Sequence, residues 1–259
     1  MSVTIFLPLF LVNVLGVSAT RAGAALIPFS LGLVFSATMA GQLVARIGYR
    51  GQIVGGGLVF LVSVILLATM GADVSYGRVT VYMVLAGLGV GPSMPLFTLA
   101  IQNAVEVRFI GQATSASQFF RQTGATVGAA LMGAVLAATL GLAFSTLEVP
   151  PELTEAPGAS AEQFVSTGGA ELPAAVRGVY AARAAGAATP AAAAEIVAEG
   201  EQVAADVAYE IRDAFSRATS RIYWLTAVLL VIAAALALRI PELPLRTTHD
   251  RSEAGPGPD

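Results

Sequence analysis

Five long apolar stretches most constrain what this chain can fold into. They are residues 22–45, 52–71, 79–101, 123–144 and 222–240. A helix needs about 20 apolar residues to cross the hydrocarbon core of a bilayer, and each stretch is close to that length. Charged residues make up only 12% of the chain, whereas a soluble domain carries about 25%. The sequence therefore predicts helices in a membrane, with the lipid bilayer as their partner.

The chain begins with a shorter apolar stretch. Residues 3–17 are almost entirely apolar and precede the polar SATRAG. They lack the basic segment and the small-residue cleavage site of a signal peptide. We interpret them as the outer part of a spanning helix whose start is missing. The predicted fold is thus all-α: a polytopic membrane protein of six transmembrane helices, of which the first is truncated.

The six predicted spans are unevenly distributed. Five lie in residues 1–144 and the last is 222–240, so that residues 145–221 form a long loop whose first part is acidic and rich in proline. The loop includes an alanine-rich segment at 190–219 with apolar residues at helical spacing, which predicts an amphipathic helix. Those apolar residues are Ile196, Val203, Val207, Ile211 and Phe215. This helix either packs on the membrane domain or binds a partner, and residues 241–259 form a polar tail.

The arginines predict the orientation of the spans. Six spans place alternate connections on the same side of the membrane. One side holds six arginines in short connections and the tail (Arg46, Arg50, Arg108, Arg239, Arg246 and Arg251), and the other holds two (Arg21 and Arg78). Short loops rich in arginine stay in the cytoplasm. We therefore expect a multi-pass protein of the cell membrane, with a cytoplasmic C-terminus and the long loop outside the cytoplasm.

Composition also disfavours several classes of function. The chain has no cysteine and one histidine, His249 in the tail, so the sequence predicts no metal site and no cofactor. The net charge of −3 gives no reason to expect nucleic acid as a partner. The spans contain no clustered acid, base and nucleophile, so an enzyme is not expected. They also contain no Asp or Glu in their cores, so this chain alone is a poor carrier of protons.

The segment GQLVARIGYRG, residues 41–51, joins two predicted spans. Gly41 and Gly48 are expected to bracket a tight turn, and Arg46 and Arg50 to contact nearby helix ends, where a cation meets the negative end of the helix dipole. The segment resembles the cytoplasmic loop motif of the major facilitator superfamily, roughly G-x-L-x-D-R-x-G-R-[RK]. Ala45 stands where that motif has an aspartate.

The resemblance extends to residues 5–144 and 222–246, which look like the second half of the fourteen-span drug:proton antiporters. It implies that the chain is the C-terminal six-helix bundle of a transporter in which two bundles rock about a central site. It also implies three partners: the missing N-terminal half, a small hydrophobic substrate and a proton. In the proteins of that family, the acidic residue that couples the proton lies in the first half of the chain.

Several residues in the spans are candidates for the substrate cavity or a gate. Arg121 is the one charge near a span interior, and Gln118 and Gln122 accompany it. It either lines a cleft, or pairs with the other bundle, or reaches toward the lipid headgroups as long basic side chains do. Met94, Phe97, Phe119 and Phe120 form either a hydrophobic wall for a substrate or part of a surface that faces lipid or the core.

Glycine and proline residues predict features of two spans. In GLGVGPSMP, Pro92 and Pro95 should kink or break the helix, either to line a cavity or, together with Gly91, simply to allow close packing. Gly124 and Gly128 have the G-x-x-x-G spacing at which helices pack closely in lipid.

Two classes of function therefore remain. The first is half of a proton-coupled exporter of hydrophobic compounds. The second is a six-helix membrane subunit with a structural or interaction role, and a truncated transporter remnant without function is a further alternative.

Overall fold

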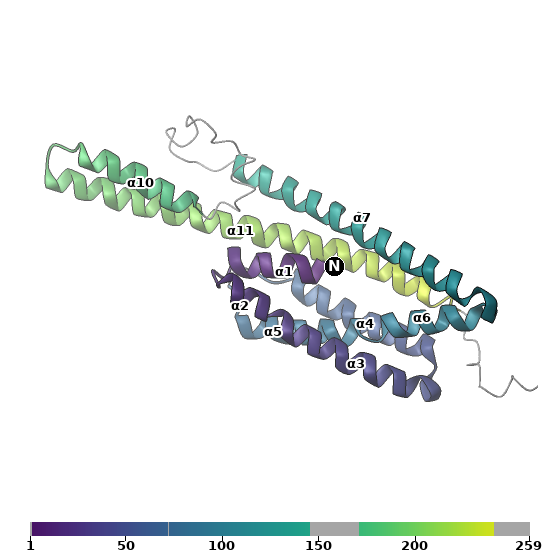
Figure 1. The fold of residues 1–259 in the computed structure, drawn as a ribbon. Helices are drawn as coiled ribbons and strands as arrows, with labels where there is room; N and C mark the ends of the chain where they lie inside the picture. The colour runs from purple at the N-terminus through teal and green to yellow at the C-terminus, as the bar shows by residue number, and fades with distance from the viewer. Residues whose placement is uncertain (1, 72, 146–170, 241–259) are drawn as a thin grey trace, which may run out of the picture. The chain divides into compact units, whose positions relative to one another are not determined.

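The computed structural model describes residues 2–71, 73–145 and 171–240, and these residues form helices joined by short connections (Figure 1). The helices are α1 Ser2–Asn13, α2 Ala19–Ala24, α3 Leu26–Ile47, α4 Tyr49–Ala68, α5 Tyr76–Val90, α6 Ser93–Ala104, the 3₁₀ turn η1 Val107–Phe109, α7 Ile110–Ser145, α10 Leu172–Ala185 and α11 Pro190–Ala237. Residues 146–170 of the predicted loop and the predicted tail, residues 241–259, lie outside the described residues.

The all-α membrane bundle is confirmed. Five helical stretches are long and apolar enough to cross a bilayer: Ala19–Ile47, Tyr49–Ala68, Tyr76–Ala104, Val107–Ala143 and Pro190–Ala237. Each contains or largely overlaps one predicted span. The first predicted span appears as the short apolar helix α1. Phe6, Leu7, Phe10 and Leu11 of α1 are buried, so this helix packs as part of the bundle.

Helix α11 joins two segments that the sequence treats separately. Its 48 residues cover both the predicted amphipathic helix and most of the last predicted span. At 1.5 Å per residue it is about 72 Å long, more than twice the roughly 30 Å of hydrocarbon that a spanning helix must cross. The predicted apolar stripe packs within this chain, because Val207, Ile211 and Phe215 are buried.

Two compact units divide the chain, and both draw on parts of several helices. Unit 1 is Met1–Leu26, Ile65–Val79 and Val127–Thr226, and unit 2 is Ile27–Val64, Thr80–Thr126 and Ala227–Asp259.

In unit 1, helix α10 packs beside the first part of α11 (Figure 1). Val176 and Tyr180 of α10 form a small core with Ala204, and Ile196 and Val203 pack against it. A Cβ atom at Gly200 would lie 2.4 Å from Cβ of Tyr180, so the glycine lets the two helices approach. The sequence did not predict α10, because its alanine-rich composition carries little periodic signal.

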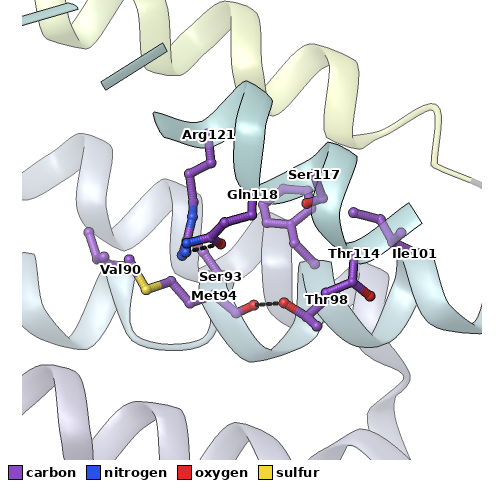
Figure 2. A pocket seen from close by; sticks show the side chains of 10 residues that line it. Val90, Ser93, Met94, Thr98, Ile101, Thr114, Ser117, Gln118 and Arg121 are labelled. Carbon is purple, nitrogen blue, oxygen red and sulfur yellow. Dashed lines mark hydrogen bonds between the residues drawn. The ribbon is translucent and has the colours of Figure 1, made fainter. Parts of the chain in front are cut away.

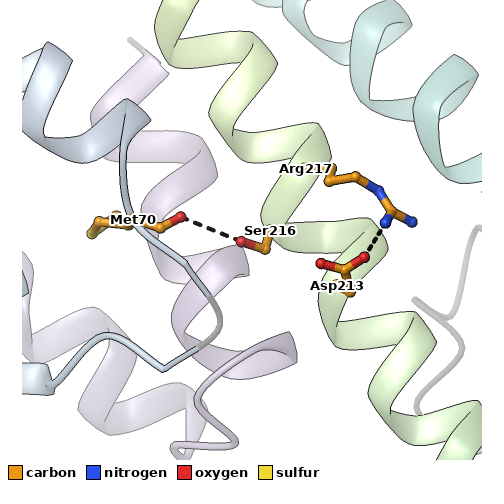
Figure 3. A network of polar contacts seen from close by, with 4 residues as sticks. All are labelled: Met70, Asp213, Ser216 and Arg217. Carbon is orange, nitrogen blue, oxygen red and sulfur yellow. Dashed lines mark hydrogen bonds and ion pairs between the residues drawn. The ribbon is translucent and has the colours of Figure 1, made fainter.

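Two serines of α11 donate hydrogen bonds to carbonyl groups at the end of α4 in unit 1. Ser216 Oγ donates to the carbonyl of Met70 at 3.3 Å, and Ser220 Oγ donates to the carbonyl of Ala68 at 2.6 Å (Figure 3 shows the first). The last carbonyls of a helix lack partners within it, and these hydroxyls satisfy two carbonyls at that end. On the neighbouring turn, Arg217 forms an ion pair with Asp213.

In unit 2, helix α5 packs closely against α3 and α4 through its glycines. A Cβ atom at Gly87 would lie 2.1 Å from the carbonyl oxygen of Phe29, and one at Gly89 would lie 2.4 Å from the backbone nitrogen of Phe60. One at Gly91 would lie 1.9 Å from Oγ of Ser36. No side chain fits at these positions, so the glycine run serves helix packing.

The loop motif forms a one-residue connection in unit 2. Gly48 alone separates α3 from α4 and has a φ of 75°, a conformation that glycine adopts without strain. Arg50 donates a hydrogen bond to the backbone carbonyl of Leu238, just after α11. This is a contact with a helix end of the kind predicted for the arginines, and Arg46 is exposed.

The expectation that Gly41 brackets the turn is wrong. Gly41 lies inside α3, well before Ile47, and a Cβ atom there would meet no atom within 4 Å. The turn needs a single residue with positive φ, and Gly48 supplies it.

Candidate functional site

The break between α5 and α6 creates the site. Helix α5 ends at Val90 and α6 begins at Ser93. Pro92 and Pro95 lack an N–H group, so neither can donate to the carbonyl four residues earlier. Helical bonds continue on both sides, from Gly91 N to Gly87 O at 3.0 Å and from Leu96 N to Pro92 O at 3.2 Å. The prolines therefore interrupt the helix locally.

A cavity of about 410 Å³ lies between α6 and the first part of α7 in unit 2 (Figure 2). It has the size of a pocket for a small organic ligand, which is about 300–1,000 Å³. Its lining residues are Val90, Ser93, Met94, Phe97, Thr98, Ile101, Thr114, Ser117, Gln118 and Arg121.

The two helices contribute walls of different chemistry. The residues from α6 recur at helical spacing, with Met94, Phe97 and Ile101 on one face. The residues from α7 also follow helical spacing, from Thr114 to Arg121, but all of them are polar. The cavity therefore has a mixed wall from α6, where Met94, Phe97 and Ile101 lie beside Ser93 and Thr98, opposite a polar wall from α7.

Arg121 is the charged residue of this cavity. Its guanidinium donates a hydrogen bond to Oε1 of Gln118, one turn earlier on α7 (Figure 2). No Asp or Glu is among the lining residues. The guanidinium has five N–H donors, so this bond leaves most of its capacity for other acceptors.

Two threonines of the cavity differ in their hydrogen bonding. Thr98 Oγ1 donates to the carbonyl of Met94 at 3.0 Å, within its own helix. Thr114 Oγ1 is buried and has no hydrogen-bond partner. Buried hydroxyls in native proteins almost always have a partner, so Thr114 Oγ1 is an unsatisfied hydroxyl within this wall.

The structure brings together four of the six predicted cavity residues. Met94, Phe97, Gln118 and Arg121 line the cavity. Phe119 is 65% exposed and stacks edge-to-face on Phe120, with ring centroids 5.7 Å apart. Gln122, which follows Arg121 on α7, is also outside the lining.

The sequence analysis missed the smaller polar residues of the cavity. Ser93, Thr98, Thr114 and Ser117 lie on the same helix faces as the predicted residues. Helical spacing from Met94 and from Arg121 would have found them, but small polar residues are common in apolar helices and carry no signal by themselves.

The predicted G-x-x-x-G contact of α7 is absent from the described part of the chain. Cβ atoms at Gly124, Gly128 and Gly133 would meet no atom within 4 Å. The spacing allows close packing but does not supply a neighbour, and tight glycine contacts among the described helices occur elsewhere, for example on α5 and at Gly200 of α11.

Comparison with known proteins identifies the family. Residues 1–129 match the family model of the Major Facilitator Superfamily. The chain is similar to the multidrug transporter protein MdtP of Bacillus subtilis, at 38% identity over 56% of the chain and 27% of the relative. It is also similar to multidrug resistance protein 3 of the same organism, at 34% identity over 51% of the chain and 26% of the relative.

A third relative is the tetracycline resistance determinant of Streptomyces rimosus, with 33% identity over 56% of the chain and 42% of the relative. The matching region thus spans less than half the length of these relatives. Together with the helical bundle, these matches identify the chain as a partial, C-terminal-half-like region of the Major Facilitator Superfamily. It is a multi-pass membrane protein of a transporter family and not an enzyme.

Proposed function

We propose that the chain is the C-terminal six-helix half of a secondary active transporter that exports small hydrophobic compounds in exchange for protons. The observation that carries the proposal is the cavity between α6 and α7, which combines apolar side chains with hydrogen-bonding groups. Such a combination is typical of small-molecule sites. The names of the relatives, which include multidrug and tetracycline resistance proteins, support a drug as the exported compound.

The second bundle of the transporter covers the open face of α7 in this proposal. Polar residues in a membrane usually face a cavity or another helix, and Arg121, Gln118 and Gln122 follow one another along α7. Gly124 and Gly128 leave a smooth surface on the same helix, which is suited to close contact with a partner helix. Substrate would lie between the two bundles, and their rocking would expose it to either side in turn.

The coupling proton requires a group that this chain does not supply in its spans. Helices α1 to α7 contain no Asp or Glu. An intramembrane carboxylate is the usual proton carrier of such transporters. We therefore assign the carboxylate to the N-terminal half.

The arginines indicate on which side of the membrane the cavity lies. The bond from Arg50 to the Leu238 carbonyl joins the α3–α4 connection to the C-terminal end of α11. Both belong to the side that the arginine count favours as cytoplasmic. Tyr49 and Ala237 share a hydrophobic cluster with Leu96 of α6, so we propose that the cavity receives its substrate in the cytoplasmic part of a cell-membrane protein.

An efflux assay on the intact transporter tests this proposal. We expect Arg121→Ala to reduce uncoupler-sensitive efflux of a fluorescent hydrophobic compound more than Arg50→Ala does, at matched membrane levels, because Arg121 lines the cavity. Equal or reversed losses would contradict this assignment of the cavity.

A second arm separates half a transporter from an independent membrane subunit. The purified 259-residue chain in liposomes should give no proton-driven efflux, because it lacks the second bundle and the carboxylate. Efflux by the chain alone that collapses with an uncoupler would refute the half-transporter proposal.

A further inference from the structure

We propose that the α6–α7 cavity selects hydrophobic anions: compounds with an apolar ring body and one acidic oxygen group, such as a carboxylate. This inference rests on the proposed function, because it assumes that the cavity holds the substrate. It adds the charge of the preferred substrate and the residue that recognises it.

The charge of the lining is the first argument. Arg121 brings a positive charge, and the other lining residues are neutral. Its partner Gln118 is a neutral amide that accepts one hydrogen bond and leaves the charge uncompensated. Guanidinium and carboxylate match in geometry and can form two parallel hydrogen bonds. A lipophilic cation would instead meet a like charge, with no carboxylate in this lining to balance it.

The shape of the cavity is the second argument. Met94, Phe97 and Ile101 line the α6 side of the cavity together with Ser93 and Thr98. Arg121 faces the cavity from α7 (Figure 2). A compound whose ring lies on the apolar side chains of α6 can therefore bring an acidic group to the guanidinium.

Equilibrium dialysis of the intact transporter in phosphatidylcholine nanodiscs tests the proposal. The probes are 2-naphthaleneacetate and 2-naphthaleneacetamide, which have nearly the same shape but differ in charge at pH 7.5. We expect the acid to bind about tenfold more tightly than the amide or better, as for a hydrogen bond to a charged group.

Two variants of Arg121 and one matched control complete the experiment. In Arg121→Gln, the acid should lose its advantage to within about twofold while the affinity of the amide stays unchanged. Arg121→Lys keeps the charge and should retain part of the preference. Arg108→Gln removes an exposed arginine that pairs with Glu106 outside the cavity, and it should keep the full preference.

The outcomes separate this inference from the proposed function. Failure of both probes to bind the unaltered transporter would count against the substrate cavity itself. Binding of both with equal affinity would leave the cavity in place but overturn its anion preference. An equal loss of acid and amide in Arg121→Gln and Arg121→Lys would also overturn it, because Arg121 would then act by shaping the site or by pairing with another part of the protein.

Discussion

Helices α5 and α7 both contain closely spaced glycines, yet these glycines have opposite environments. On α5, Cβ atoms at Gly87 and Gly89 would overlap the backbones of α3 and α4. On α7, Cβ atoms at Gly124, Gly128 and Gly133 would meet nothing within 4 Å. Both sets of glycines are closely spaced, but only those of α5 meet a neighbouring helix in this structure.

This difference separates the packing surface of α5 from the candidate site on α7. The contacts of α5 hold the bundle together, since close backbone approach is what small residues provide in lipid. The face of α7 that carries Arg121 and Gln118 borders the cavity instead. We therefore expect substitutions on α5 to affect stability and substitutions on the first part of α7 to affect ligand binding.

The largest expected loss of stability is that of Gly87→Ala. The new Cβ atom would lie 2.1 Å from the carbonyl oxygen of Phe29, and backbone cannot move aside as a side chain can. Overpacking of this kind should lower the free energy of unfolding by about 3 kcal/mol, as measured by circular dichroism during denaturation in micelles. A loss below about 1 kcal/mol would mean that α3 and α5 are less closely packed than the structure indicates.

Ser63→Ala should have a smaller effect on the same packed region. Ser63 is fully buried, and its Oγ donates to the carbonyl of Tyr82 at 2.7 Å between α4 and α5. Loss of this bond should lower the free energy of unfolding by about 1 kcal/mol, measured in the same way. Ser117→Ala on α7 is the matched control and should change stability little. A larger loss for Ser117 than for Ser63 would reverse the comparison.

Arg50→Gln should lower the free energy of unfolding slightly less than Ser63→Ala does. The variant removes the charged donor to the Leu238 carbonyl at the end of α11. A cation at a helix C-terminus contributes about 0.5 kcal/mol, so the midpoint of unfolding should fall a little and high salt should reduce the difference. The exposed Arg46 provides the control, and an equal fall for Arg46→Gln would show that the contact with α11 is not the cause.

Gly128→Ala should give a small change in the opposite direction. The site has room for a methyl group, and alanine in a helix interior is more stable than glycine by roughly 0.5–1 kcal/mol. We expect unfolding of the isolated chain to occur at the same or a slightly higher denaturant concentration. Destabilisation similar to that of Gly87→Ala would show that α7 packs against a neighbour after all.

The sequence predicted most of the fold because its main signal is local. Apolar stretches of spanning length identified the membrane helices, and each is helical in the structure. Prediction was weaker where local signals compete. The segment 190–240 was divided into an amphipathic helix and a span, since its composition changes near residue 220, but a helix can continue through the change of environment and α11 does so.

The candidate site was predicted only in part. Arg121 and Gln118 were conspicuous because polar groups are costly in a membrane and rare in these spans. Phe119 was equally conspicuous, but its position on α7 turns it away from the cavity lining, and it is largely exposed. The sequence did not predict Thr114 as a cavity residue, because neither the burial of its hydroxyl nor its lack of a hydrogen-bond partner is a property of the sequence.

By itself, the sequence determined that the chain forms apolar helices of membrane-spanning length, that Gly48 marks a turn and that Pro92 marks an interruption. These follow from hydropathy and from the backbone restrictions of single residues. Only the tertiary structure decided which glycines meet a neighbour and which polar residues share a cavity. Both depend on the distance between helices that are far apart along the chain, and spacing along one helix says which residues share a face but not what that face meets.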